Sequence, residues 1–204
     1  MSEIVSATPG RLRVLVIDVT RNRKQFEHAV TRTVFWSLKG CGVALATEDP
    51  VLVGDIKDIS SAFEAADGKF NTVLLIAHGG PDPGGGMASE VDLAGEVVHW
   101  YLAGSLFPGI KDNLVCLAVC HGSCHDAVQS LTNGDNFAMT LVAPKTTLSL
   151  LEVCTFFPTF FDDLNRSTTS SIPADVVERC VNDNNHLAKG KMCVNSAGKT
   201  VPVS

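Results

Sequence analysis

The chain has 204 residues, of which 45% are hydrophobic and 19% charged, and a formal net charge of −6. Its mean hydropathy of +0.19 and pI near 5.4 are those of an ordinary globular protein, long enough to bury a sizeable core. Because no basic cluster stands out, nucleic acid is excluded as an expected partner. No stretch approaches the roughly 18 apolar residues of a membrane span and the N-terminus lacks a secretory pattern, so we expect a cytoplasmic protein without a membrane partner.

In chain order, the apolar periodicity predicts alternating strands and helices. They are a strand at residues 14–18, a helix at 24–38, a strand at 43–46, a helix at 58–66, a strand at 72–77, a helix at 96–106, a strand at 114–119, a helix at 125–131, a strand at 137–142, a helix at 148–164 interrupted at Pro158, a helix from about Pro173, and a strand at 191–194. This order favours an α/β fold, a three-layer αβα sandwich with helices on both faces of a mostly parallel sheet. We expect one domain over residues 1–204, with a core at about 12–165 and a C-terminal helix and last strand at about 172–195.

Two of the predicted strands end in a reactive side chain. The strand Val73–Ala77 is followed by His78 and Gly79, and the strand Leu114–Val119 is followed by Cys120. In open parallel sheets, ligands and chemistry gather just beyond the carboxyl ends of the strands. The sequence therefore predicts a base and a thiol at one edge of the sheet, the pair that a Cys/His nucleophilic hydrolase uses.

Each residue of this pair has an expected chemical role. The attacking species is the thiolate, and Cys120 is placed where the strand turns into the next helix, whose positive end favours the anion. His78 would accept the proton. Gly79 lacks a Cβ, so its N–H can approach a substrate closely and form an oxyanion hole together with the N–H of Cys120.

These motifs resemble the caspase-like cysteine peptidases of clan CD, which include caspases, metacaspases, paracaspases, separase and the bacterial CHAT proteases. The caspase signature Gln-Ala-Cys-x-Gly, with a His upstream, corresponds here to Ala118-Val119-Cys120-His121-Gly122 with His78. The resemblance covers roughly residues 12–165. It departs from the family where Ala118 and Val119 replace Gln and Ala, and where Cys-His-Gly-Ser replaces the Cys-His-Ser-Gly order of metacaspases.

The resemblance implies a six-stranded caspase-like sheet and the activity of a cysteine endopeptidase that hydrolyses peptide bonds with a Cys-His dyad. Cys120 would be the nucleophile and His78 the base or acid. The substrate would be a protein or peptide, and no metal or organic cofactor would be needed.

The resemblance also places part of the pocket for the residue before the cut at the end of the first strand. There the chain offers Asp18 together with the basic Arg21 and Arg23, and Ala118 stands where metacaspases carry an Asp. Caspases select Asp with a basic pocket, whereas metacaspases, separase and CHAT proteases select Arg or Lys with acidic residues. Because the other matches are to bacterial caspase-like proteins, we favour a basic residue in the substrate.

Regulation is expected to differ from that of caspases, which are matured by cleavage between the strands that correspond to residues 114–119 and 137–142. The connection around Thr132–Asn136 is short, so control by a loop, an activating protein partner or cleavage elsewhere is more expected. Arg166, beside a Ser/Thr-rich stretch, is one candidate for cleavage, or else part of an exposed linker. Analogy with the bacterial branch suggests a signalling or defence role.

Other reactive residues have structural interpretations. Cys124 is a rival nucleophile but is predicted to fall inside the next helix, and Cys116 lies within a strand. The run Cys120–His125 offers metal ligands, but no second pair completes a tetrahedral set. The remaining cysteines, expected to be reduced and packed as small hydrophobes, are Cys41, Cys154, Cys180 and Cys193. The remaining residues weighed are His28, His99 and His186, expected to be structural or solvated, and Trp36 and Trp100, expected in the core.

Two other classes of function stay open. One is a catalytically inactive caspase-like scaffold that keeps the fold for binding, although such a protein has no chemical need for His78 and Cys120. The other is a hydrolase or transferase that holds an anion with the glycine-rich residues 80–86. That stretch lacks the Gly-x-Gly-x-x-Gly and Walker patterns, which weakens the case for phosphate binding.

Overall fold

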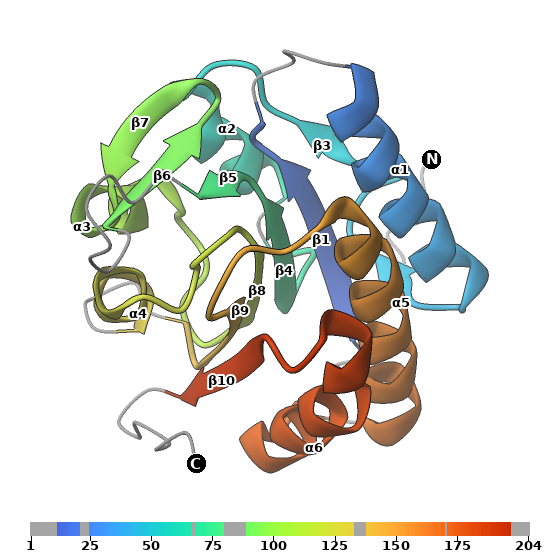
Figure 1. Cartoon of the computed structure of the whole chain (residues 1–204). Helices are drawn as coiled ribbons and strands as arrows, with labels where there is room; N and C mark the ends of the chain where they lie inside the picture. Colours follow the sequence, from blue (N-terminus) through green and yellow to red (C-terminus); the bar gives the residue numbers. More distant parts are fainter. Residues whose placement is uncertain are drawn as a thin grey trace, which may run out of the picture.

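The computed structural model describes residues 12–20, 25–66, 68–79, 89–132, 138–169 and 171–196. At its centre is a mostly parallel sheet of seven strands with the order β10-β9-β8-β4-β1-β2, in which β3 also pairs with β1 (Figure 1). Its strands are β1 (Arg13–Asp18), β2 (Ala44–Leu45), β3 (Val51–Leu52), β4 (Thr72–Ile76), β8 (Leu114–Ala118), β9 (Thr140–Pro144) and β10 (Met192–Ser196). Within this described sheet, β10 alone runs antiparallel to its neighbour. The predicted α/β class and mostly parallel sheet are confirmed, with the short β3 as a strand that the sequence did not predict.

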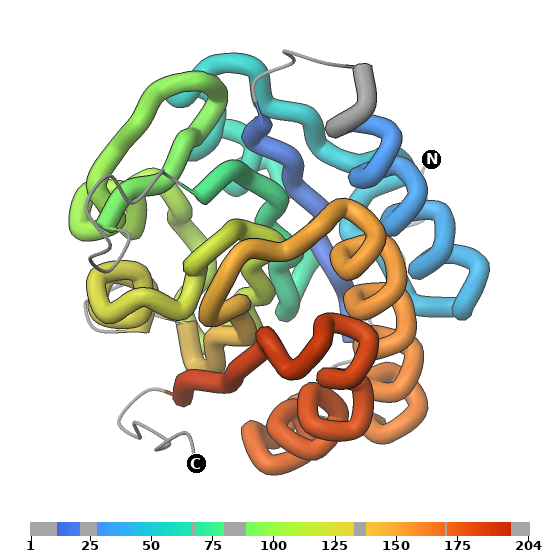
Figure 2. Tube along the Cα trace, viewed as in Figure 1, coloured from blue at the N-terminus to red at the C-terminus, as the bar shows by residue number. Residues whose placement is uncertain are grey.

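Helices cover both faces of the sheet, which makes the molecule an α/β sandwich. One face carries α1 (Gln25–Gly40), α5 (Leu150–Ser167) and α6 (Ala174–Asn184), and the other carries α2 (Asp58–Ala65), α3 (Trp100–Ala103) and α4 (His125–Thr132). Figure 2 shows the red C-terminal segment lying beside the orange α5, with which α6 and the turn at Asn185–Ala188 are in contact. None of the helices in the described residues is long and apolar enough to cross a membrane.

The central strands are buried on both sides, which explains their continuous apolar sequences. In β1, Val14 and Val16 face the core under α1, α5 and α6, which we call the first core. Leu15 and Ile17 face the second core, under α2, α3 and α4. Because successive side chains of a strand point to opposite faces, a strand between two helical layers needs apolar residues at every position.

Helix α5 is continuous through Pro158, where the sequence predicts an interruption. A proline inside a helix removes one backbone hydrogen bond and costs about 3 kcal/mol or more. The helix survives because its inner face is a cluster of buried rings, among which Phe156 and Phe160 stack with centroids 5.6 Å apart. Burying several Phe side chains outweighs one lost hydrogen bond, since each contributes several kcal/mol.

The N-terminus of α5 is fixed by a capping box and an ion pair. The Ser149 hydroxyl accepts from the Glu152 N–H, and the Glu152 carboxylate accepts from the Ser149 N–H at 2.7 Å. Lys191, just before β10, donates to both oxygens of the same buried carboxylate at 2.8 and 3.0 Å. These hydrogen bonds, led by the one from Lys191, lower the pKa of Glu152 to about 2.

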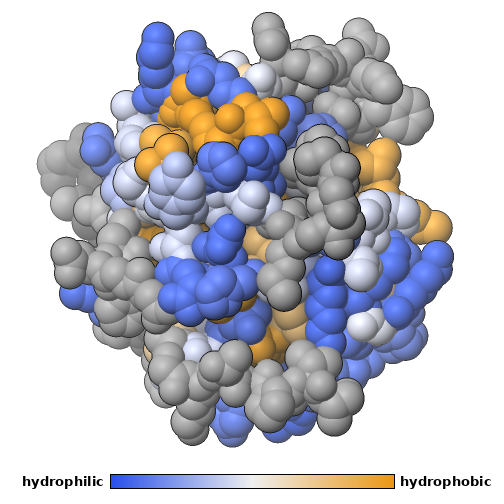
Figure 3. Space-filling model, turned by 60° about the vertical axis from the view of Figure 1, so that its left-hand side comes forward, coloured by the Kyte–Doolittle hydropathy of each residue, from blue (hydrophilic) through white to orange (hydrophobic). Residues whose placement is uncertain are grey.

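A second, three-stranded sheet lies beside the ends of the main strands and consists of β5 (His78–Gly79), β6 (Glu90–Leu93) and β7 (Glu96–His99). The predicted helix over 96–106 is wrong at its start: β7 occupies 96–99, and only α3 and a 3₁₀ turn at Gly104–Leu106 are helical. The alternation in β6, a segment for which the sequence analysis predicts no element, turns Val91 and Leu93 inward to the second core. Large hydrophobic side chains are exposed on β7 and α3, namely Val97, Tyr101 and Leu102. Figure 3 shows one apolar area near the top of the molecule in that view.

Other expectations about the fold need correction or lie outside the described residues. Trp36 is half exposed on α1, with the Lys39 ammonium 4.6 Å above its ring, because Phe35 and Leu38 take the inward positions; Trp100 is buried as expected. Strand β9 begins at Thr140 rather than residue 137.

Arg166, the candidate cleavage site, lies in the last turn of α5 and pairs with Asp162 at 2.7 Å. Cleavage after Arg166 would therefore first require the helix to unwind. The loop at residues 80–86 and the connection at 133–136 lie outside the described residues.

The ion pair at the start of α5 predicts a specific dependence of stability on pH. A carboxyl whose pKa is lower in the folded chain stabilises it fully above its ordinary pKa, near 4.5, and loses that effect as the pH falls toward about 2. Glu152→Gln should therefore lower the free energy of unfolding by about 1–3 kcal/mol at neutral pH, and this difference should shrink below the ordinary pKa. Urea denaturation at a series of pH values measures it.

The matched control is Glu64→Gln, which removes an exposed carboxylate from α2. It should change the free energy of unfolding by less than about 0.5 kcal/mol at any of these pH values. A Glu152→Gln difference that stays constant down to the lowest pH would contradict the ion pair.

Candidate active site

The parallel strands β1, β4 and β8 are neighbours and end at one edge of the sheet. Asp18 is paired in register with Ile76, and Ile76 with Ala118. The pairing continues one residue further, where the Ala77 N–H donates to the Ala118 carbonyl at 3.4 Å. His78 and Cys120 each come two residues after the last register pair, so the chain brings both to the same edge from adjacent strands.

Gly79 lies directly against the backbone of Cys120. A Cβ atom at position 79 would be 2.1 Å from the Cys120 carbonyl oxygen and 2.9 Å from the Cys120 Cβ, closer than any side chain can approach. The sequence suggested that the missing Cβ lets Gly79 approach a substrate. In the structure, the missing Cβ is what lets the segment carrying His78 pack against the segment carrying Cys120.

Cys120 occupies the second position of a tight turn directly after β8. The Gly122 N–H donates to the Val119 carbonyl at 3.0 Å, and His121, the third residue of the turn, has a φ of +57°. A positive φ at that position is typical of a type II turn, where glycine is preferred. A non-glycine residue there costs on the order of 1 kcal/mol or more, so the turn is held by its surroundings rather than by its own sequence.

Two N–H groups that follow Cys120 already have acceptors. The N–H groups of His121 and Ser123 donate to Thr146 and Pro144 at 3.3 and 3.0 Å. Among the residues that the structure describes, the N–H of Cys120 donates to no acceptor. When a thiolate attacks a carbonyl carbon, the carbonyl oxygen becomes negative close to the sulfur. An N–H group beside the sulfur can stabilise that oxygen by donating a hydrogen bond to it.

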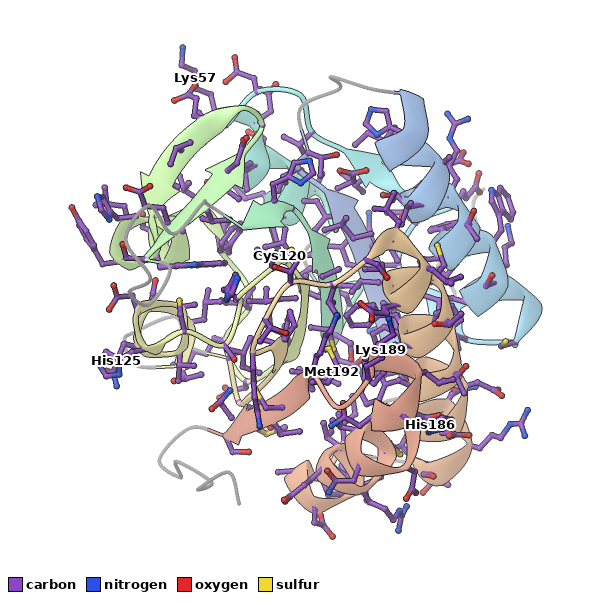
Figure 4. All side chains as sticks on the ribbon, viewed as in Figure 1. Lys57, Cys120, His125, His186, Lys189 and Met192 are labelled. Carbon is purple, nitrogen blue, oxygen red and sulfur yellow. The ribbon has the colours of Figure 1, made fainter. Side chains whose placement is uncertain are left out.

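The half-buried Cys120 thiol donates to the Leu148 carbonyl at 3.9 Å. Leu148 belongs to residues 145–149, which connect β9 to α5 and which we call the covering loop. Figure 4 shows Cys120 at the strand-end edge, beside the chain segment that leads into α5. The candidate nucleophile is therefore held between the strand end and the covering loop.

The other cysteines near the site are less suited to react. Burial raises the pKa of Cys116 well above the ordinary thiol value, and burial also raises that of Cys124, partly offset by the Ala127 N–H. A raised pKa leaves less thiolate at neutral pH. The prediction that Cys124 falls inside the helix is wrong, because α4 begins at His125. Residues 121–124 therefore separate Cys120 from the helix. Cys120 is thus five residues before the first residue of α4, whereas the effect of a helix end is confined to about one turn.

His78 is exposed at the start of β5 and pairs in register with Asp92 of β6. Residues directly opposite in antiparallel strands have Cβ atoms about 5 Å apart, so Asp92 is a carboxylate beside the candidate base that the sequence analysis missed. Its carboxylate accepts from the Gly95 N–H at 2.7 Å. The alternation of Val91, Asp92 and Leu93 was the available signal, but the sequence analysis assigned no strand or helix to these residues.

Two of the predicted pocket residues, Asp18 and Ala118, are buried in the structure. Asp18 is fully buried, and its carboxylate accepts from the Thr20 N–H and hydroxyl at 2.8 and 2.5 Å and the Thr31 hydroxyl at 2.6 Å, with His28 Nδ1 3.2 Å away. In this structure the Asp18 carboxylate thus joins the end of β1 to α1. Ala118 is buried in the first core, and Arg21 lies outside the described residues.

At one edge, the arrangement brings together a thiol, an imidazole from the neighbouring strand and the Cys120 N–H, which donates to none of the described residues. In the described part of the chain, no group of three or more His, Cys, Asp or Glu side chains is placed to hold a metal ion. Figure 4 shows His125 and His186 at the periphery, away from Cys120. Compared with known proteins, the chain matches no protein-family model and no curated protein.

The contact at Gly79 predicts a steric effect of substitution. Gly79→Ala should lower the free energy of unfolding by about 1–3 kcal/mol, because the new methyl group meets backbone atoms of Cys120 that cannot rotate away. Urea denaturation measures the change.

Gly54→Ala is the matched control, since nothing lies within 4 Å of a Cβ at that position. It should change the free energy of unfolding by less than about 0.5 kcal/mol. Equal effects of the two substitutions would show that the close approach at Gly79 does not exist.

Proposed function

We propose that the chain is a cysteine endopeptidase in which Cys120 is the nucleophile and His78 the general base. The observation that carries the proposal is the packing of Gly79 against Cys120, which joins the strand ends that bear the imidazole and the thiol. The resemblance of these two strand ends to those of caspase-like peptidases gives the same assignment. Proteolysis is favoured over other acyl transfer by that resemblance.

The proposed reaction is acyl transfer to Cys120 followed by hydrolysis. His78 takes the proton from the Cys120 thiol, and the thiolate adds to the carbonyl carbon of the substrate peptide. The oxygen that becomes negative accepts from the Cys120 N–H, which has no acceptor among the described residues. The imidazolium then protonates the leaving amine, and water hydrolyses the thioester to release the acid and restore the thiol.

The proposed substrate is a protein or peptide with Arg or Lys before the cut. The net charge of −6 attracts a basic peptide and repels an acidic one. Asp18 adds no direct support, because its carboxylate is buried and occupied by Thr20 and Thr31. Control by an activating partner remains part of the proposal, as does a role in signalling or defence.

The alternative is an inactive scaffold that keeps the fold for binding. It is favoured by the exposed apolar residues of β7 and α3, since grouped apolar surface of this kind is typical of contact sites. They are Val97, Tyr101 and Leu102, with exposed fractions of 55%, 68% and 52%. A scaffold needs no reactive thiol, so reactivity at Cys120 distinguishes the two.

The test is labelling by peptidyl acyloxymethyl ketones that carry Arg, Lys or Asp at the position before the cut, together with cleavage of the corresponding fluorogenic peptides. We expect the Arg or Lys probe to attach to Cys120, as located by mass spectrometry. Cys120→Ala should abolish labelling and cleavage, and His78→Ala should lower kcat/KM by about a hundredfold or more.

Cys124→Ala is the matched control, because it removes a half-buried thiol four residues away and should keep most of the activity. Activity that survives in Cys120→Ala and disappears in Cys124→Ala would move the nucleophile to Cys124. Labelling of the isolated wild type at neither position would favour the scaffold over an enzyme that is active without a partner.

A further inference from the structure

The covering loop contacts the turn that carries Cys120 from several positions. The Leu148 carbonyl accepts from the Cys120 thiol at 3.9 Å, and the Thr146 carbonyl accepts from the His121 N–H at 3.3 Å. The Leu148 side chain is buried in the first core, which limits the movement of its carbonyl. The position of the thiol therefore depends on the position of this loop.

The opposite side of the covering loop is fastened by one residue from the C-terminal part of the chain. Lys191 Nζ donates to the Thr147 carbonyl at 2.8 Å, and the Lys191 carbonyl accepts from the Lys145 N–H at 2.8 Å. The same ammonium donates to both carboxylate oxygens of Glu152. Since Glu152 also accepts from the Ser149 N–H, the ion pair joins the middle of the loop to its end.

The burial of this ion pair separates it from an ordinary surface pair. Glu152 is buried and the Lys191 side chain is only 25% exposed, so water screens the pair weakly. Lys189 approaches the same carboxylate at 3.3 Å, but its side chain is 75% exposed and has no hydrogen bond to the covering loop. Exposed ion pairs contribute little to stability. Lys191 therefore holds the covering loop, whereas Lys189 forms only an exposed ion pair with Glu152. Lys189 and Met192 lie on either side of Lys191 in the sequence, and Figure 4 shows both beside α5.

We propose that Lys191 is a positioning residue for the candidate nucleophile: through Thr147 and Glu152 it fixes the covering loop whose Leu148 carbonyl orients the Cys120 thiol. This inference rests on the proposed role of Cys120. Misplacing a reacting atom by about 1 Å can cost on the order of a hundredfold in rate, so a residue that holds the nucleophile acts on catalysis without touching the substrate.

Three variants test the proposal. Lys191→Met removes the ammonium and keeps a side chain of similar length, Lys191→Arg keeps the charge and the donors, and Lys189→Met removes the exposed lysine. Lys191→Met should lower kcat by roughly tenfold or more with KM nearly unchanged, because orientation and not binding is lost. Lys191→Arg should restore most of kcat, and Lys189→Met should leave it within about twofold.

Site-resolved alkylation by iodoacetamide gives a second measurement that does not need a substrate. A loosened covering loop should expose Cys120, so Lys191→Met should speed its alkylation several-fold while the buried Cys116 and Cys180 stay as slow as in the wild type. A general loss of stability would instead speed alkylation at all three thiols. Lys189→Met should behave like the wild type.

The two measurements separate failure of this inference from failure of the proposed function. Alkylation of Cys120 that is the same in Lys191→Met and Lys189→Met would overturn the positioning role, whether or not peptides are cleaved. A kcat of Lys191→Met equal to or above that of the wild type would overturn it as well. Selective exposure of Cys120 in a protein that cleaves no peptide would keep the loop contact and remove the endopeptidase.

Discussion

The candidate site depends on one steric constraint, the absence of a side chain at position 79. The Gly79 backbone and the Cys120 backbone are in direct contact, with no space for even a methyl group between them. This contact sets how close the end of β4 and the turn after β8 can come. The short His-Gly motif thus has a structural meaning, because the residue after the candidate base must be the smallest available.

The second requirement is the turn that carries Cys120, whose backbone conformation is unfavourable for a non-glycine residue at position 121. His121 adopts a positive φ, which costs free energy for a residue with a Cβ. The cost is offset by backbone hydrogen bonds from His121 and Ser123 to the segment after β9 and by the packing of Gly122 against Val119 and Leu117. Strain of this kind collects at functional positions, and here it lies next to a thiol and an N–H without a partner among the described residues.

Contacts from distant parts of the chain complete the site. The covering loop follows β9, and Lys191, which fastens it, precedes β10. The antiparallel β10 brings Lys191 back beside the loop, where the Lys145 N–H meets the Lys191 carbonyl. Addition of this last strand therefore does more than extend the sheet, because it links the C-terminal part of the chain to the surroundings of Cys120.

The sequence by itself determined the α/β class and the buried strands β1, β4 and β8, because apolar periodicity is a local property of the chain. It also determined that His78 and Cys120 arrive at one edge, because the carboxyl ends of parallel strands lie at the same edge of a sheet. It missed β7 and the continuity of α5 through Pro158, since there the packing of β6 against the second core and of the phenylalanines against the first core outweighs local preference. Tertiary structure alone decided that Asp18 is enclosed by Thr20 and Thr31, that Asp92 lies opposite His78, and that Lys191 reaches the covering loop. These contacts join residues through the geometry of the folded sheet, which no spacing along the chain encodes.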